Sequence, residues 1–230
     1  MTEITNNPVF GIFLTLIVYR GMVFLKQKYN YALNNPLLTG ISAIVLILLI
    51  FKIPYENYKV GGDFIHFLLG PATVVLAVPL YRQIELLKKN LLPIIIGVFS
   101  GSIFALLSIG FLSKLFNFNQ ELTASLLPKS VTMPIGIEVA ESLGGISSIT
   151  VIAIVVTGII GAVLSEKILL FARITDKVAQ GISIGTSSHA LGTTKAIEMG
   201  EVQGGMSGLA IGLTGFFTAL LAPFVLSFFF

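Results

Sequence analysis

Eight apolar stretches divide the chain, and five of them are long and continuous enough to form helices that cross a lipid bilayer. A spanning helix needs about 20 mostly apolar residues, because the hydrocarbon core of a bilayer is about 30 Å thick. Only 11% of the residues are charged and 55% are hydrophobic, and the mean hydropathy is +0.95. A soluble domain carries about 25% charged residues, so the composition argues against a soluble enzyme or a nucleic-acid-binding protein. The continuous stretches are Val9–Leu25, Pro36–Ile53, Leu91–Leu115, Ile146–Phe171 and Met206–Phe230.

The other three stretches are apolar but interrupted. Phe64–Tyr81, Leu122–Leu143 and Val178–Met199 each hold Pro or Gly beside Ser or Thr in their middle. Such a segment forms either a kinked helix or two half-helices with non-helical backbone between them, and the second form survives at membrane depth only inside protein or along a wet cavity. Three of them in one chain favour the second form and a binding site. The expected breaks are at Gly70, Pro71, Pro128, Pro134, Gly185 and Gly192.

The chain also matches itself at a shift of 57 residues. Pro71 and Thr73 fall on Pro128 and Ser130, and a second shift takes Ser130 to Ser187. Repeats with interrupted helices are typical of secondary transporters. The fold class predicted here is therefore an all-α polytopic membrane protein with about five to eight membrane segments, discontinuous or re-entrant helices and internal repeats. Further matches join Gly101, Ala105, Leu107 and Ser108 to Gly158, Ala162, Leu164 and Ser165.

Basic residues in short loops indicate orientation, because such loops favour the cytoplasmic side. The loops 20–34, 82–90 and 166–177 are basic, whereas the loop at 52–63 is balanced in charge. Both of the loops 82–90 and 166–177 can lie on the cytoplasmic side of the membrane only if Leu122–Leu143 is a re-entrant hairpin. We favour this hairpin over a crossing helix. This topology predicts that the N-terminus and the C-terminus both lie on the outer side of the cell membrane.

Charged residues inside a membrane segment are functional candidates, because burying charge in lipid is costly. Lys129, Ser130 and Thr132 form the expected anion site at one break, and the hydroxyl-rich stretch Thr186–Thr193 forms it at the next, with Lys195 just beyond. Cations, hydroxyls and half-helix N-termini together suit a carboxylate. An ion pair between Lys195 and Glu198 near the membrane surface explains those two residues equally well. The remaining predicted substrate-binding residues are Thr73, Ser187, Ser188, His189 and Thr193, and the predicted coupling residues are Glu138, Glu141, His189 and Glu198.

Enzyme chemistry finds little support in the sequence. The chain has two His, no Cys and no H-E-x-x-H pattern, so neither a metal site nor a thiol nucleophile is expected. The run Ser187–Ser188–His189 places a base beside a hydroxyl, but neighbours within one turn rarely reach triad geometry. We expect no cofactor, and the choice between H⁺ and Na⁺ as a coupling ion stays open. Glycine pairs such as Gly97–Gly101 and Gly158–Gly161 are expected to serve close helix packing.

Three separated motifs make the chain resemble the LrgB/CidB family. They are FLLGPATVVLAVPLYRQ, LLPKSVTMPIGIEVAESLGG and GTSSHALGTTKAIEMGEVQGGMSGLA, and NNPLLTG fits as well. The resemblance extends from about Pro8 to the C-terminus. It implies one LrgB-like transmembrane domain over residues 1–230, in which we expect residues 8–60 to be a scaffold and residues 64–228 a repeat-containing core.

The resemblance implies two functions of different classes. Bacterial members are described as antiholin-like proteins that modulate murein hydrolases and autolysis beside a small LrgA/CidA-type membrane protein, and chloroplast relatives export glycolate and glycerate. Bacterial pairs are also linked to uptake of pyruvate or other short acids. The charged and hydroxyl residues at the breaks favour a carrier of small organic monoanions, with a regulator of a holin-like partner as the alternative. The expected partners are the LrgA/CidA-type protein, a small carboxylate substrate, the lipid bilayer and a second copy of the chain, with no nucleic acid.

Overall fold

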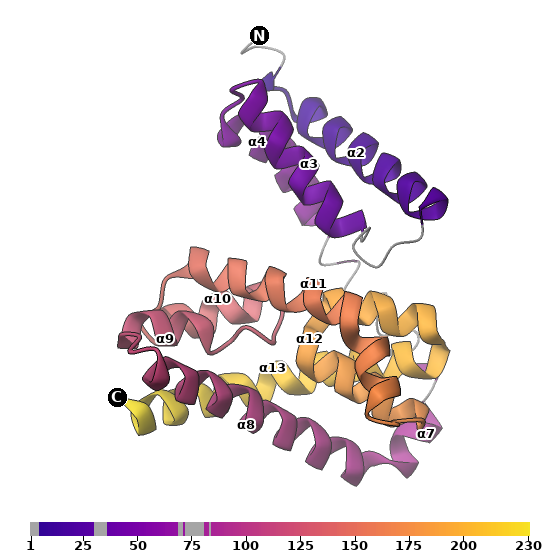
Figure 1. Ribbon diagram of the computed structural model, residues 1–230, viewed down its shortest axis with the longest axis vertical. Coiled ribbons are helices and arrows are strands. Elements are labelled where there is room, and N and C mark those ends of the chain that lie inside the picture. The colour runs from indigo at the N-terminus through magenta and orange to yellow at the C-terminus, as the bar shows by residue number, and fades with distance from the viewer. Residues whose placement is uncertain (1–4, 30–35, 69–70, 72–80, 83) are drawn as a thin grey trace. The chain divides into compact units, whose positions relative to one another are not determined.

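The computed structural model describes residues 5–29, 36–68, 71, 81–82 and 84–230, and every regular element in this part of the chain is a helix (Figure 1). Four of these helices are long and apolar enough to cross a membrane, namely Pro8–Lys28, Leu91–Leu115, Ser147–Phe171 and Glu201–Phe229. The protein is therefore an all-α membrane protein. Two compact units, Met1–Val75 and Leu76–Phe230, make up the chain. The division into a scaffold and a functional core stays a prediction.

The first unit holds α2 (Pro8–Lys28), α3 (Pro36–Ile50) and α4 (Tyr55–Phe67). Helices α2 and α4 cross closely at Gly11 and Gly61, where a Cβ on Gly11 would lie 2.9 Å from the Gly61 Cα. Beside this crossing, the hydroxyls of Thr15 and Tyr58 lie 2.9 Å apart and form a hydrogen bond. Contact between the two backbones therefore joins α4 to α2.

Two sequence expectations for the first unit need correction. Helix α3 ends at Ile50 instead of Ile53, because Lys52 takes a positive φ of 51° and closes the helix. Its 15 residues extend about 22 Å, less than the hydrocarbon thickness. The stretch 52–63 is mostly helical in α4 and not the predicted loop. Of the expected broken segment Phe64–Tyr81, Gly70 and Thr73 lie outside the described residues, and Pro71 is described but exposed.

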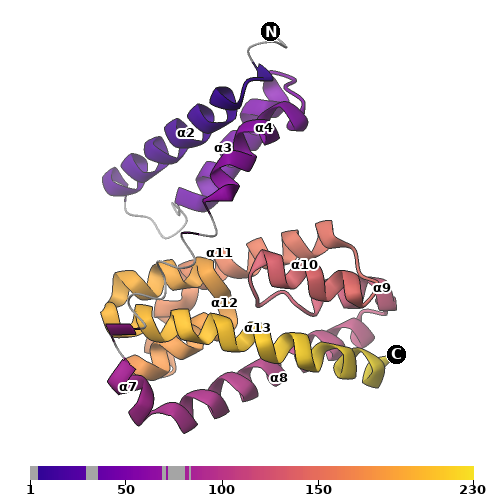
Figure 2. The same cartoon turned by 180° about the vertical axis from the view of Figure 1, so that it is seen from behind.

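The second unit is built on three long helices, α8 (Leu91–Leu115), α11 (Ser147–Phe171) and α13 (Glu201–Phe229). The short helix α7 (Ile84–Lys89) precedes α8. Helices α8 and α13 run side by side in the same direction (Figure 2). Their ring pairs Phe99–Phe217 and Phe111–Phe229 have centroids 5.2 and 5.1 Å apart.

Helix α11 runs opposite to α8, because the chain that joins them turns back on itself. This connection contains α9 (Gln120–Leu126) and α10 (Met133–Ser142), about 10 and 15 Å long, and neither can cross a bilayer alone. After α10 the chain returns to α9, where the Ile146 amide donates to Ser125 Oγ at 2.7 Å. The geometry agrees with a re-entrant segment. It places residues 84–90 and 166–177, from two of the predicted loops, at one end of the unit, although the membrane face that this end meets stays a prediction.

Helix α12 (Lys177–Met199) folds back on itself at His189, whose φ of 43° and ψ of −144° are not helical. In a straight helix Gly192 and Ile184 would be about 12 Å apart. Here a Cβ on Gly192 would lie 3.1 Å from Ile184 Cγ2. The two halves of α12 therefore pack as a hairpin that starts from the opposite end of the unit to α9. The break falls on His189, and the predicted break residues Gly185 and Gly192 are helical.

The 57-residue repeat is visible in this architecture. Adding 57 to the bounds of α10 gives 190–199, the second half of α12, and adding 57 to α11 gives 204–228 within α13. The packing repeats too, since Gly145 lies against the backbone of Ser125 and Gly181 lies against the backbone of Gln203. The second unit thus contains two copies of a half-helix, a break, a half-helix and a long helix, and the copies enter from opposite ends.

A buried apolar cluster fills the end of the second unit where α8 and α13 finish. It joins side chains of α8, α9, α10 and α13 to the residue that follows α9. Its fully or nearly buried members are Leu106, Ile109, Ala124, Leu127, Val139, Ala222 and Leu226.

Candidate functional site

The first break is the non-helical stretch between α9 and α10. Pro128, predicted as a break residue, lies within it, and Pro134 lies in the first turn of α10, where proline is tolerated. Thr132 occupies the N-cap position of α10, and its side chain accepts no capping hydrogen bond from the helix backbone. Lys129 and Ser130 stand just before it, with Ser130 buried and Lys129 half-buried. A cation and a hydroxyl therefore precede the N-terminal end of a half-helix.

The second break is held by hydrogen bonds around His189, whose side chain is 2% exposed. Its Nε2 lies 2.9 Å from the Ile154 carbonyl of α11. Its own carbonyl accepts a hydrogen bond from Thr193 Oγ1 at 2.9 Å, and that hydroxyl lies 2.7 Å from Ser207 Oγ in α13. The His189 ring thus ties the turn of α12 to α11, and Thr193 ties it to α13.

Glycines on the long helices make room for this turn. A Cβ on Gly101 of α8 would lie 2.8 Å from Thr186 Cγ2, and one on Gly158 of α11 would lie 2.6 Å from His189 Cε1. A Cβ on Gly161 would overlap Ser188 Oγ. The predicted packing role is confirmed for these three glycines, whose neighbours lie at or just before the second break, whereas a Cβ on Gly97 would make only an ordinary contact, at 3.8 Å from Ile182 Cγ2.

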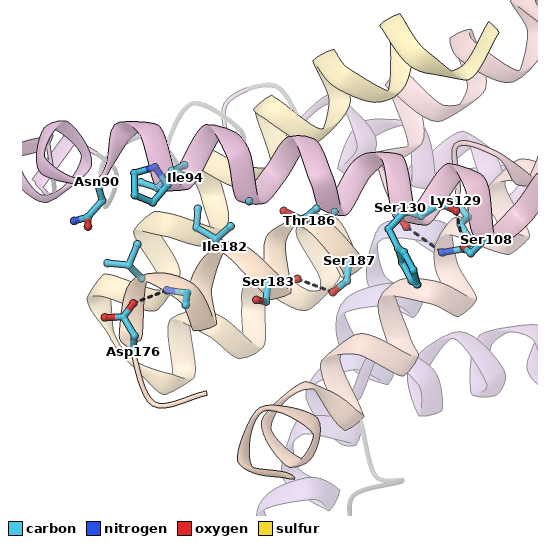
Figure 3. Close-up of a pocket in the computed structure, with 17 residues that line it drawn as sticks. Asn90, Ile94, Ser108, Lys129, Ser130, Asp176, Ile182, Ser183, Thr186 and Ser187 are labelled. Atoms are coloured by element: carbon cyan, nitrogen blue, oxygen red, sulfur yellow. Dashed lines mark hydrogen bonds between the residues drawn. The ribbon is translucent and has the colours of Figure 1, made fainter. Parts of the chain in front are cut away.

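A cavity of about 600 Å³ lies between α8 and the first half of α12 (Figure 3). At one end it reaches Asn90 and Asp176, near the starts of α8 and α12. At the other end Lys129, Ser130 and Ser108 lie together. We call this space the α8 cavity. Ser183, Thr186 and Ser187 of α12 form part of its wall.

A second cavity of about 530 Å³ lies between α11 and α12, and we call it the α11 cavity. Its wall includes Thr157, Gly161 and Ser165 of α11 and Ser188 of α12. Three residues line both cavities, namely Lys129, Ser183 and Ser187. The first break therefore shares both cavities with the first half of α12, and Lys129 lines them together with the hydroxyls of Ser183 and Ser187.

Lys129 has no acidic partner within the described part of the chain. Its Nζ donates to Ser130 Oγ at 3.1 Å, and no described carboxylate lies within salt-bridge distance. An ammonium has three N–H donors, and a half-buried charge without a counter-ion is costly. The electrostatics of this position suit an anionic ligand.

Lys195, in contrast, is paired. Its Nζ lies 2.8 Å from Glu166 Oε2 and 3.6 Å from Glu198 Oε2. The predicted pair Lys195–Glu198 is therefore present, and Glu166 of α11 is a partner that sequence reasoning missed. This cluster joins α11 to the second half of α12.

The other predicted residues lie away from the cavity walls. Glu138 and Glu141 of α10 are exposed, and Glu141 accepts a hydrogen bond from Ser147. Among the predicted substrate-binding residues, Lys129, Ser130, Ser187 and Ser188 line a cavity. Thr132, His189, Thr193 and Lys195 do not line either one, and Thr73 is outside the described residues. Their roles in binding and coupling stay predictions.

Ser183 is a cavity residue that sequence reasoning missed. It is the centre of Gly181-x-Ser183-x-Gly185, a pattern that serine hydrolases place at a strand-to-helix turn. Here the pattern lies inside helix α12, so it lacks the turn that exposes a nucleophile. In the part of the chain that the structure describes, no three His, Asp or Glu side chains gather as metal ligands.

Ser108 and Ser165 were also missed as site residues, although the repeat relates them. Ser108 lines the α8 cavity, and Ser165, 57 residues later, lines the α11 cavity. Their match in the repeat was the signal that could have found them. The two cavities are therefore related by the repeat at their serine positions.

A multi-pass all-α membrane protein with two oppositely inserted broken segments is the class that this fold and site define. The LrgB-like family model matches residues 15–228, so the chain belongs to the LrgB-like family. It is 36% identical over 220 residues to uncharacterized protein YwbG of Bacillus subtilis strain 168, covering 96% of this chain and 98% of that protein. It is 38% identical over 214 residues to uncharacterized protein YxaC of the same strain, covering 93% of each. No solved structure matches the chain.

Proposed function

We propose that the protein is a membrane carrier of small organic monoanions, such as glycolate, glycerate or pyruvate. The observation that supports this most directly is the position of Lys129. It is a half-buried cation without a described acidic partner, and it lines both cavities where the first break meets the first half of α12, the helix that the second break interrupts. In transporter folds built from inverted repeats, substrates bind at such meeting points of broken helices.

The neighbouring hydroxyls complete a carboxylate site. Ser130 contacts Lys129, and Ser183 and Ser187 stand on the shared wall. A lysine paired with hydroxyl donors binds a carboxylate through charge-assisted hydrogen bonds. Coupling to H⁺ or Na⁺, with Glu138, Glu141, Glu198 or His189 as the proton-exchanging residue, is part of the same proposal.

Uptake by proteoliposomes tests the proposal. Purified protein should accumulate labelled glycolate, glycerate or pyruvate, and the Lys129→Ala, His189→Ala double variant should not. Lys88→Gln, which removes an exposed cation of α7, is the matched control and should keep the wild-type rate. Wild-type flux no greater than that of the double variant, for all three acids, would exclude the carrier.

One observation favours the second function, a regulator that restrains an LrgA/CidA-type holin-like partner and so controls murein hydrolase release. Much of the surface of α2 and α3 is exposed and apolar, for example at Phe13, Leu46 and Leu49. Such faces suit lipid, a partner helix or a second copy of the chain. Deleting the partner gene separates the two functions, because a regulator then loses every phenotype whereas a carrier keeps its flux.

A further inference from the structure

Each cavity holds a buried hydroxyl that has no hydrogen-bond partner. Thr186 Oγ1 in the wall of the α8 cavity and Ser165 Oγ in the wall of the α11 cavity are both unpaired. Their side chains are 7% and 8% exposed. Hydroxyls inside a helix usually bond to the carbonyl four residues earlier, and a buried one left unpaired is destabilising. Both hydroxyls therefore retain unused hydrogen-bonding capacity within a residue of a cavity wall.

The two cavities lie on either side of one ridge, the face of α12 that carries Ser183 and Ser187. Ser183 and Ser187 are four residues apart on α12, so they lie on one helix face, and both line the cavities on either side. Lys129 also lines both cavities. The long helices contribute repeat-related positions, Ser108 from α8 and Ser165 from α11.

We infer that the anion site is forked: one cation, Lys129, serves two chambers, with Thr186 as the hydroxyl ligand in the α8 chamber and Ser165 in the α11 chamber. This rests on the proposed function and adds two binding residues and a second chamber to it. Because the chambers share one positive charge, an anion in one excludes an anion from the other. The ligand class is a small monoanion with one carboxylate for Lys129 and a group that bonds to a hydroxyl.

Single cysteines test the fork, because the native chain has none. Thr186→Cys and Ser165→Cys are each reacted in proteoliposomes with an anionic methanethiosulfonate (a sulfonatoethyl group) and with its cationic trimethylammonium counterpart. The anionic reagent should react about tenfold faster at both positions, because each thiol shares a cavity with Lys129. Adding Lys129→Gln should remove that preference at both.

Two further cysteine variants serve as controls, one at an accessible position and one at a buried position. Ser183→Cys, on the exposed ridge, should react and should also lose its anion preference with Lys129→Gln. Ser102→Cys, a buried unpaired hydroxyl position on α8 that lines neither cavity, should react slowly with both reagents.

Dependence on Lys129 at only one of the two positions would overturn the shared cation. Reaction at Ser183→Cys with none at Thr186→Cys or Ser165→Cys would overturn the chambers. These readouts use no transported substrate, so they are separate from the uptake assay. If Lys129→Gln abolishes uptake but alters labelling at one position only, the fork is wrong and the carrier stands.

Discussion

The two breaks of the second unit interrupt their helices in different ways. At the first, six residues separate α9 from α10, and they include a cation without a described acidic partner. At the second, one residue reverses the chain, and hydrogen bonds to α11 and α13 hold it in place. The repeat therefore preserves where the helices break but not what the breaks do. We interpret the first break as the one that meets the ligand and the second as the one that fixes the wall opposite.

Filling the space that glycines leave around the second break should lower the stability more than any other change proposed here. Gly161→Ala would place a Cβ against Ser188, so α11 and α12 must move apart, at a cost of about 2–3 kcal/mol in the free energy of unfolding. Thermal unfolding in detergent, followed by loss of the monodisperse elution peak, measures it.

Gly212→Ala is the matched control, because a Cβ there meets no atom within 4 Å. It should leave stability unchanged or raise it by about 0.5–1 kcal/mol, as for an unhindered helical glycine. Equal behaviour of the two variants would mean that α11 does not press on the second break.

Lys129→Gln should separate ligand binding from stability. Uptake should fall about tenfold to a hundredfold, the loss expected when one charged hydrogen bond of about 1.5–3 kcal/mol is removed. The thermal midpoint should hold or rise, because an unpaired half-buried charge is gone. Lys129→Arg keeps the charge and should retain more uptake than Lys129→Gln. A lower midpoint with unchanged uptake would make the first break structural as well.

Substitution of Lys129 should affect uptake, whereas substitution of His189 should affect stability. The stability has two contributions here, the contact of the His189 side chain with α11 and the conformation of its backbone. His189→Ala loses the contact with the Ile154 carbonyl and keeps the positive φ, whereas His189→Gly loses the same contact but relieves the backbone. The glycine variant should therefore be more stable than the alanine variant by about 1–2 kcal/mol. Comparing the two thermal midpoints measures this difference. An alanine variant as stable as the glycine variant would show that the backbone of this turn is unstrained.

The smallest effect is expected at the contact between the second half of α12 and α13. Thr193→Val removes the local hydrogen bond to the His189 carbonyl and the one to Ser207 Oγ, and the loss of the second, between helices, should cost about 1 kcal/mol. Thr194→Val is the neighbouring control, because the exposed Thr194 hydroxyl bonds only locally to the Leu191 carbonyl. The difference between the two midpoints is the measurement, and no difference would remove Thr193 from the account of how the turn is held.

Much of this architecture was predictable because proline and sequence repetition leave direct marks. Pro128 marks the first break, and the repeat at 57 residues gives the register of α10 on the second half of α12. Lys129 and Ser130 stood out because charge and hydroxyls are costly within apolar segments.

The second break could not be located in the same way. Gly185 looked like a break, but the structure uses it for close approach, since a Cβ there would lie 2.8 Å from Ala210 Cβ of α13. The turn falls instead on His189, where no glycine or proline marks it in the sequence and a hydrogen bond to the Ile154 carbonyl of α11 holds the side chain. Partners across helices, such as Glu166 for Lys195, are likewise set by packing and have no local sequence signal.

The apolar cluster next to the first break has a kinetic consequence for a carrier. The cluster includes Leu127, two residues before Lys129 in the chain, and packs among α8, α9, α10 and α13 beside the first break. An anion that passed between the ends of α8 and α13 would have to separate these side chains, and separation wets apolar surface that was dry. Wetting apolar surface raises the heat capacity. The Arrhenius plot of uptake should therefore curve, and smaller side chains in the cluster should make it straighter and the protein leakier.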